Sequence, residues 1–273
     1  MTTQATAGYE LRQRGDLRVL AWPALDGLPV DALVTTRHGG VSGGDYGTLN
    51  LSFSVGDRLE NVLENRRRAA AALGAGLADF VFATQVHGPV ARIVTAADRG
   101  RGATAPGSTV GEADALVTSD PGTVLAVLVA DCVPIVLYDP GAHVLACVHA
   151  GWRGTVARAA QAALAAMATL GARPASVIAG IGPAIGPGYQ VGDEVAQAAR
   201  ESFGEHAPVR PDGTGRWLFD LWAANRSILR EAGVPQERIH LAAVPTGADF
   251  FSDRAARPCG RFAAIARLRP CAG

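Results

Sequence analysis

The sequence predicts a mixed α/β (α+β) protein in which one domain forms a layered sandwich of mixed sheets and helices. The chain has 273 residues, of which 48% are hydrophobic and 18% charged, so it can bury a sizeable core. Helical and extended segments are both present, and several extended segments follow one another without a helix between them. This order favours a mixed sheet over a regular doubly wound one. No internal repeat or linker divides the chain, so we expect a single domain over 1–273, with 1–16 as a loose N-terminal tail.

The N-terminal third predicts a strand and a helix around a flexible loop. The segment 30–57 reads as a strand, a glycine-rich loop at 39–47 and a further extended stretch. Asp57 and Glu60 then fit a capping box, in which a side chain at the helix start and an acid three residues later satisfy free N–H groups. A helix rich in arginine, alanine and leucine is therefore expected over 58–73.

The rest of the chain is rich in strands. A long loop is expected at 99–109 and a helix from about 155 to 170. Apolar segments bounded by turn residues predict strands over 80–87, 113–119, 123–129, 133–138, 143–149, 239–244 and 261–268.

Two segments near the C-terminus predict further helices. Residues 175–195 read as a strand, a rigid Gly/Pro loop that can line a pocket, and the start of a helix. Residues 217–234 predict an amphipathic helix, because Phe219, Trp222 and Ile228 share its apolar side.

The charge composition excludes several kinds of chemistry. The 25 basic and 25 acidic residues cancel, which gives no support for a nucleic-acid or anionic-membrane partner. All basic residues are arginine, so a Walker A lysine, a Schiff-base lysine and a Ser–Lys dyad are excluded.

The cysteines and the apolar segments predict a cytoplasmic protein with reduced thiols. The four cysteines show no CxxC motif and no disulfide-type spacing, and the N-terminal residues show no secretory signal. The longest apolar run, 123–138, is interrupted by Asp131, Cys132 and Pro134 and is too short to cross a bilayer. No obligate protein partner is evident.

A thiol and two imidazoles form a candidate metal site. Alternate residues of a strand share a face, so Cys147 and His149 are expected to point the same way, as are Gln85 and His87. Cys132 lies at the break between two strands, where a side chain can leave the core. His87, Cys132 and His149 would suit zinc and leave its fourth position open, which is the catalytic arrangement. The alternative is that each histidine is a partly buried core residue, and Cys147 reads as a small buried hydrophobe.

Two arginines are candidates for binding an anion. Arg153 lies among glycines just before a helix, and Arg37 lies beside a glycine run, so either guanidinium could bind phosphate. The alternative for each is an arginine at a surface turn. Asp131 either orients a ligand or caps the end of a strand.

Several motifs occur in order along the chain: TRHGGVS, LNLSFSVGD, NRRR, QVHG, ADALVT, ADCVP, HAGWRGT, IGPAIGPGYQVGDEV, DLWAANR and FFSDR. Together they resemble the laccase-domain family, also called the multicopper polyphenol oxidase or YfiH-like family and since re-described as purine nucleoside phosphorylases. The resemblance extends from about 19 to 268.

The resemblance implies a cysteine-hydrolase-like sandwich with zinc held by His87, Cys132 and His149. It also implies that Arg37, Asn50 and Arg153 lie around the pocket. One departure is Pro245, which stands where many relatives have a cysteine, so one pocket wall can differ here.

The family's names imply different activities. A multicopper oxidase needs roughly ten histidines, largely in His-x-His pairs, whereas this chain has six and no such pair, so a copper-bound polyphenol oxidase is disfavoured. Copper can nevertheless replace zinc at such ligands. The favoured activity is phosphorolysis of adenosine, inosine, guanosine and methylthioadenosine, with a nucleoside and phosphate as ligands and adenosine deamination as a further activity. The alternative is a peptidoglycan-editing hydrolase that acts on a mis-aminoacylated UDP-sugar precursor.

Overall fold

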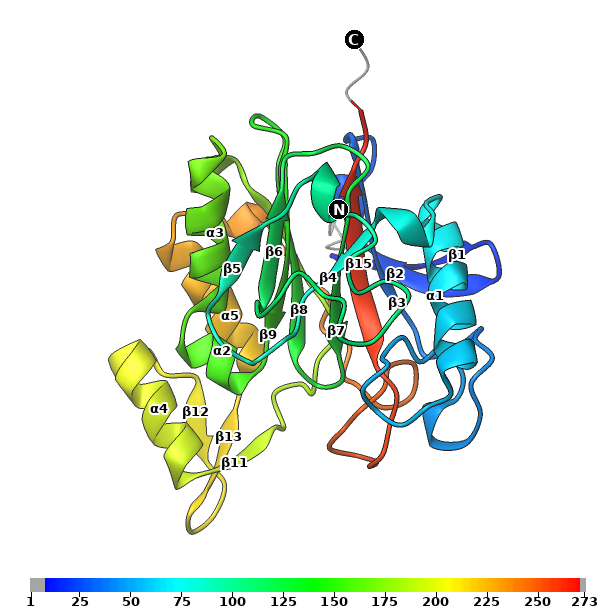
Figure 1. Ribbon diagram of the computed structural model, residues 1–273. Helices are drawn as coiled ribbons and strands as arrows, with labels where there is room; N and C mark the ends of the chain where they lie inside the picture. The colour runs from blue at the N-terminus through cyan, green and yellow to red at the C-terminus, as the bar shows by residue number, and fades with distance from the viewer. Residues whose placement is uncertain (1–7, 271–273) are drawn as a thin grey trace, which may run out of the picture.

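The computed structural model describes residues 8–270 and shows two six-stranded sheets packed face to face between helices (Figure 1). The first sheet has the order β1-β2-β3-β15-β7-β4, with β1 Glu10–Arg14, β2 Leu17–Ala21, β3 Val30–Thr35, β15 Phe262–Leu268, β7 Val124–Val129 and β4 Phe80–Phe82. The second has the order β14-β10-β8-β9-β6-β5, with β14 Ile239–Leu241, β10 Ile178–Ile181, β8 Val133–Asp139, β9 Val144–Ala150, β6 Ala115–Thr118 and β5 Ala91–Ile93. The predicted mixed α/β fold is therefore confirmed.

The helices cover the outer faces of the two sheets. They are α1 Leu59–Leu73, α2 Trp152–Val156, α3 Ala159–Thr169, α4 Asp193–Phe203 and α5 Leu221–Glu231. In Figure 1, α1 lies beyond the first sheet and α2, α3 and α5 lie beyond the second. A small sheet, β11-β13-β12, packs with α4 at one end and consists of β11 Gln190–Gly192, β13 Arg216–Phe219 and β12 Val209–Pro211. No helix within 8–270 is long and apolar enough to span a membrane.

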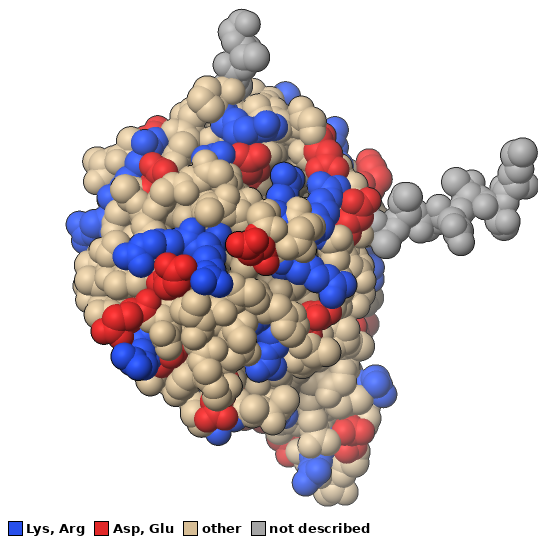
Figure 2. Space-filling model, turned by 90° about the vertical axis from the view of Figure 1, so that its right-hand side faces the viewer, with Lys and Arg blue, Asp and Glu red and all other residues tan. Residues whose placement is uncertain are grey.

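Short 3-10 helices occur between these elements, at Pro23–Leu25, Gly44–Tyr46, Leu77–Asp79, Ala96–Asp98, Pro174–Ser176, Gly204–His206 and Gln236–Arg238. The face that carries α1 shows arginines and acidic residues interspersed, with no continuous surface of one sign (Figure 2).

Strands β8 and β9 are buried on both faces, and the candidate site lies at their ends. In β9, Ala146 and Val148 pack toward the helices, whereas Cys147 packs toward the first sheet. Every residue of both strands is buried, which explains why their sequences are nearly continuous apolar runs. Because side chains alternate along a strand, His149 lies on the same face as Cys147 and points between the sheets.

The capping box predicted at Asp57 and Glu60 is wrong. The residue that precedes α1 is Arg58, and no side chain caps the helix start. The Asp57 carboxylate instead accepts hydrogen bonds from Ser42 Oγ (2.6 Å) and Asn50 Nδ2 (2.9 Å). This acid therefore joins two loops rather than starting the helix.

The helix expected over 155–170 is in fact two helices, α2 and α3. They are separated at Arg158, whose backbone is left-handed with a φ of 60°. The Arg158 guanidinium donates to Glu231 (2.7 Å) and to the Ser202 carbonyl (2.9 Å). The periodicity of the sequence does not predict contacts between residues so far apart in the chain.

The helix expected over 217–234 begins as a strand. Strand β13 runs to Phe219, and the helix α5 starts only after Asp220, whose Oδ1 accepts a hydrogen bond from the Ala223 N–H (2.9 Å). An N-cap aspartate of this kind ends the extended segment and opens the helix.

Two further differences concern strands. Within the expected tail, Glu10–Arg14 form β1 and pair antiparallel with β2, so that prediction is wrong for these residues, whereas 1–7 lie outside the described residues. The strand expected over 80–87 ends at Phe82, so His87 lies in a loop and not at a strand end.

Candidate metal and substrate site

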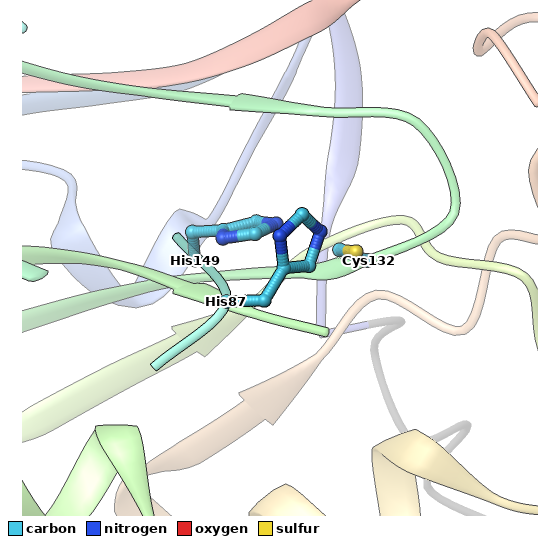
Figure 3. A group of neighbouring side chains, drawn as sticks. All are labelled: His87, Cys132 and His149. Atoms are coloured by element: carbon cyan, nitrogen blue, oxygen red, sulfur yellow. The ribbon is translucent and has the colours of Figure 1, made fainter. Parts of the chain in front are cut away.

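His87, Cys132 and His149 meet at one place (Figure 3). Cys132 lies between β7 and β8, His149 near the end of β9, and His87 in the loop after β4. One potential ligand atom from each residue lies within 4.8 Å of the others, and the two imidazole rings meet edge to face with centroids 4.7 Å apart. His149 is buried, Cys132 is half-buried and His87 is exposed, so the cluster is anchored in the core and open on one side.

Asp114 positions both histidines. Its buried carboxylate accepts hydrogen bonds from the backbone N–H groups of His87 (2.9 Å) and Gly88 (2.7 Å) and contacts His149 Nδ1 at 2.8 Å. Because Nδ1 of His149 is engaged there, Nε2 is the ring nitrogen left for a metal. Burial raises the Asp114 pKa, but the hydrogen bonds from His149 and Gly88 outweigh it and hold that pKa below its usual value. Asp114 therefore stays ionised and fixes the orientation of His149.

Gln85 fastens the loop that carries His87. Its side-chain Nε2 donates to the Leu128 carbonyl and its Oε1 accepts from the Leu128 N–H, both at 2.7 Å. The Gln85 amide thus pairs with the backbone of β7 as a neighbouring strand would. The His87 backbone is left-handed, with a φ of 61°, which turns the chain beside this attachment.

Gly151 leaves the space that the three side chains need. A Cβ atom at this position would lie 2.8 Å from Cys132 Sγ and 3.0 Å from His87 Cδ2. Both distances are shorter than ordinary van der Waals contact. The room for the cluster therefore depends on the glycine directly after β9.

The thiol and the buried imidazole form a coupled pair. Burial alone would raise the Cys132 pKa, but the charge of His149 and hydrogen bonds from both histidines lower that pKa to about 6. Burial alone would lower the His149 pKa, but the Cys132 thiolate and the Asp114 carboxylate raise it to about 9. Cys132 is therefore ready to act as a thiolate, the form in which cysteine binds metals.

A cavity of about 780 Å³, called the main cavity below, opens over these three residues. Its apolar and aromatic lining includes Leu128, Trp152, Ile185, Tyr189 and Leu221. Its cationic lining consists of Arg153, Arg254, Arg257 and Arg261. The volume lies within the range of roughly 300–1,000 Å³ that is usual for small-molecule sites.

The four arginines differ in their partners. Arg257 and Arg261 both pair with Asp253, at 2.5 Å and 2.9 Å. The guanidinium groups of Arg153 and Arg254 form no ion pair with any residue in 8–270. These two are therefore the cations available to an anionic ligand.

The two unpaired arginines lie over aromatic rings. Arg153 lies 4.3 Å from the centroid of the Trp152 ring, and Arg254 lies 5.0 Å from that of Tyr189. Stacking of this kind holds a guanidinium in place and leaves its N–H groups free to donate. Arg153, a candidate phosphate ligand in the sequence, thus lies in the lining of the main cavity.

Asp131 lines the cavity but uses both carboxylate oxygens within the protein. Oδ1 accepts a hydrogen bond from the Thr246 hydroxyl, and Oδ2 accepts one from the backbone N–H of Arg254 at 2.7 Å. Its backbone is left-handed, with a φ of 81°. Asp131 thus ties two loops to the cavity. Pro245, beside Thr246, is exposed and forms an isolated parallel β-bridge with Ala184. It does not line the main cavity.

Arg37, a candidate phosphate ligand in the sequence, contacts two loops. Its Nε donates to the Gly47 carbonyl (3.1 Å), a second nitrogen donates to the Gly247 carbonyl (3.4 Å), and its guanidinium lies over Phe251. These contacts hold the glycine-rich loop, and Arg37 is not part of the cavity lining.

Asn50 is likewise outside the cavity lining. It is fully buried, and its Oδ1 accepts hydrogen bonds from the backbone N–H groups of Ser52 (3.0 Å) and Arg261 (2.9 Å). It therefore supports the chain segment that carries Arg261.

Sequence reasoning missed Asp114, Tyr189 and Arg254. Asp114 could have been noticed as an acid at the start of the apolar segment ADALVT, where an ionised side chain needs several donors. Tyr189 and Arg254 come from segments far apart in the sequence, and no local pattern connects them.

Comparison with known proteins gives consistent matches. Residues 31–269 match a family described as multi-copper polyphenol oxidoreductase laccase. A purine nucleoside phosphorylase of Deinococcus radiodurans is 44% identical over 229 residues, which is 83% of this chain and 84% of that protein. A protein named adenosine deaminase RL5, from an unknown prokaryotic organism, is 40% identical over 77% of this chain and 81% of its own. The crystal structure of YlmD from Geobacillus stearothermophilus superimposes with a TM-score of 0.90 at 36% identity, covering 95% of this chain and 99% of that one.

Proposed function

The chain belongs to the family described as multi-copper polyphenol oxidoreductase laccase, and we propose that it is a zinc-dependent purine nucleoside phosphorylase. The resemblance found in the sequence is thereby confirmed at the level of the family. The proposed substrates are inorganic phosphate and adenosine, inosine, guanosine or methylthioadenosine. The observation that carries the proposal is the cluster of His87, Cys132 and His149 in a cavity that also holds Arg153 without an ion-pair partner within 8–270.

The chemistry of the donor set supports zinc. A thiolate and two imidazoles are ligands that zinc prefers, and three protein ligands leave one coordination position open. Asp114 supplies the carboxylate that commonly orients a zinc-binding histidine, and Gly151 leaves the necessary room. When bound, zinc supplies Lewis-acid polarisation at the open position. Copper can compete for the same donors, since it binds them more tightly.

The cavity residues divide the remaining tasks. Arg153 binds phosphate through its free N–H groups, and the rings of Trp152 and Tyr189 provide flat faces for the purine. A phosphate oxygen then attacks C1′ of the ribose, the bond from C1′ to the purine nitrogen breaks, and the base leaves with the electron pair. The apolar side chains of Leu128 and Ile185 limit water at the reacting carbon.

Ligand number argues against a multicopper oxidase. The chain has six histidines, and within 8–270 the three-residue cluster is the one group of His, Cys, Asp or Glu side chains placed to hold a metal. A second activity, adenosine deamination, is supported by the relative named adenosine deaminase. It would use the same cavity.

The test is turnover of adenosine and inosine by the zinc-loaded protein, with and without phosphate, with products resolved by chromatography. We expect free base and ribose 1-phosphate only when phosphate is present, and inosine from adenosine without phosphate if deamination also occurs. Cys132→Ala should abolish cleavage, whereas Cys147→Ala, a change at a buried cysteine outside the cavity, should retain it. Failure of the wild-type protein to cleave either nucleoside would overturn the proposal and turn attention to cell-wall precursors.

A further inference from the structure

A second hollow of about 420 Å³ adjoins the main cavity. Tyr189 and Arg254 line both, so the two spaces meet at these side chains. The second hollow is otherwise formed by the small sheet and the start of α4, through Gln190, Gly192, Val195 and Arg216 among others. A ligand in the main cavity can therefore extend past Tyr189 into this groove.

Two guanidinium groups converge on Gln190 in this groove. Arg216, on β13, donates to Gln190 Oε1 at 3.4 Å. Arg254 donates to the Gln190 backbone carbonyl at 3.1 Å. The two arginines come from segments far apart in the sequence, and the fold brings them to the same residue.

Neither guanidinium is neutralised by the protein. Arg216 and Arg254 form no ion pair with a carboxylate of residues 8–270. The acids nearby are engaged elsewhere, because Asp212 accepts a hydrogen bond from Gln190 Nε2 (2.7 Å) and Asp193 accepts one from Trp217 Nε1 (2.7 Å). A pair of arginines without a counter-charge suits an anion with several oxygens, above all a phosphate monoester.

We propose that Arg216 and Arg254 bind the 5′-phosphate of a purine nucleotide, so that nucleoside 5′-monophosphates bind here in addition to nucleosides. The inference rests on the proposed function, which places the purine and ribose in the main cavity and inorganic phosphate at Arg153. A second phosphate site next to the nucleoside is needed only if the nucleoside carries a phosphate of its own.

The corresponding reaction is balanced without a further reactant. An oxygen of inorganic phosphate forms a bond to C1′, the bond between C1′ and the purine nitrogen breaks, and the base leaves with the electron pair and takes up a proton. The products from inosine 5′-monophosphate are hypoxanthine and ribose 1,5-bisphosphate. The 5′-phosphate does not react and serves only in binding.

The test compares binding of inosine, inosine 5′-monophosphate and inorganic phosphate by calorimetry, with the zinc-loaded full chain. We expect the nucleotide to bind at least about tenfold more tightly than inosine, as charge-assisted hydrogen bonds allow. Arg216→Gln should remove this advantage. Arg210→Gln is the matched control, because Arg210 lies on the same small sheet but lines neither hollow, and it should preserve the advantage.

Four outcomes decide the inference. Loss of the nucleotide's advantage in Arg216→Gln but not in Arg210→Gln would support the binding site, and ribose 1,5-bisphosphate detected by mass spectrometry would in addition support the reaction. Equal binding of nucleotide and nucleoside, or an advantage that survives Arg216→Gln, would overturn the inference. Arg216-dependent binding of inorganic phosphate without any nucleotide advantage would also overturn it, since the groove would then hold free phosphate. Because binding is measured without turnover, failure of inosine phosphorolysis would count against the proposed function alone.

Discussion

Two clusters of polar side chains in this protein differ in composition and in what they face. The first, called the Asn65 network, consists of Ser42, Asn50, Asp57 and Asn65, and the second is the His87–Cys132–His149 cluster. In the network, the Asn65 amide donates to Ser42 Oγ and to the Thr48 and Asn50 carbonyls and accepts from the Val41 N–H. Its polar groups are satisfied inside the protein.

The second cluster has hydrogen-bond partners within the protein only on its core side. The Asp114 carboxylate forms hydrogen bonds with the His149 ring and the His87 backbone N–H. On the other side, the Cys132 thiol and the two imidazoles lie close together at the open main cavity. The difference shows that a polar residue in a recognisable motif does not necessarily bind a ligand. A ligand-binding site is distinguished by donor and acceptor atoms that have no partner within the protein and face a cavity.

The largest effect should come from Gly151→Ala. The new Cβ would displace Cys132 Sγ and His87. We therefore expect zinc content and activity to fall by more than about 100-fold, which exceeds the loss typical when a residue that only orients a metal ligand is changed. Gly154→Ala is the control, because its Cβ would meet its neighbours at 3.4 Å or more. Zinc content is measured by elemental analysis. Full zinc occupancy in Gly151→Ala would show that the three side chains do not bind the metal together.

A smaller loss is expected for Asp114→Asn. An amide cannot accept all the hydrogen bonds that this carboxylate accepts, so zinc affinity should fall about 10- to 100-fold. Affinity is measured by competition with a chelator. Asp139→Asn is the matched control, since Asp139 is equally buried and accepts backbone N–H groups at Gly141 and Arg173, away from the cavity. Equal zinc affinities in the two variants would refute the positioning role of Asp114.

Asn65→Ala should affect stability and not catalysis. Removing this amide leaves buried partners unsatisfied, so the free energy of unfolding should fall by about 1–3 kcal/mol. The value of kcat should stay within about twofold of wild type, since Asn65 lies outside the cavity. Denaturant unfolding and steady-state kinetics measure the two quantities. A large loss of kcat in a folded variant would erase the distinction between the clusters.

The smallest effect concerns pH in the zinc-free protein. The Cys132 pKa is lowered to about 6, so the stability that the thiolate contributes is present above the unfolded thiol pKa and is lost as pH falls through about 6. The His149 pKa is raised to about 9, so its contribution is complete below the unfolded imidazole pKa and is lost as pH rises through about 9.

Alkylation measures the thiolate directly. The rate at Cys132, followed by peptide mass spectrometry, should have a midpoint near pH 6, whereas Cys147, whose pKa burial raises, should remain unlabelled. A midpoint for Cys132 near that of a free thiol would contradict the coupling with His149.

The sequence marked His87, Cys132 and His149 as candidate metal ligands, with partly buried core residues as the alternative, and the family resemblance favoured the metal site. Cys132 interrupts two apolar strands, and the alternation of β9 places His149 toward the other sheet. The supporting residues were not predictable in this way. Asp57 fits a helix cap in the sequence, but its carboxylate accepts hydrogen bonds from Ser42 and Asn50. Arg37, a candidate phosphate ligand in the sequence, donates to two loop carbonyls. Each depends on contacts between segments that only the folded chain brings together.

The most direct test of the central claim is the zinc content of three purified proteins: wild type, Cys132→Ala and Asn50→Ala. The account predicts one zinc per chain in the wild type and in Asn50→Ala, because Asn50 is a structural residue, and little or none in Cys132→Ala. Zinc retained in Cys132→Ala, or lost from a folded Asn50→Ala, would contradict the assignment of the metal to the His87–Cys132–His149 cluster.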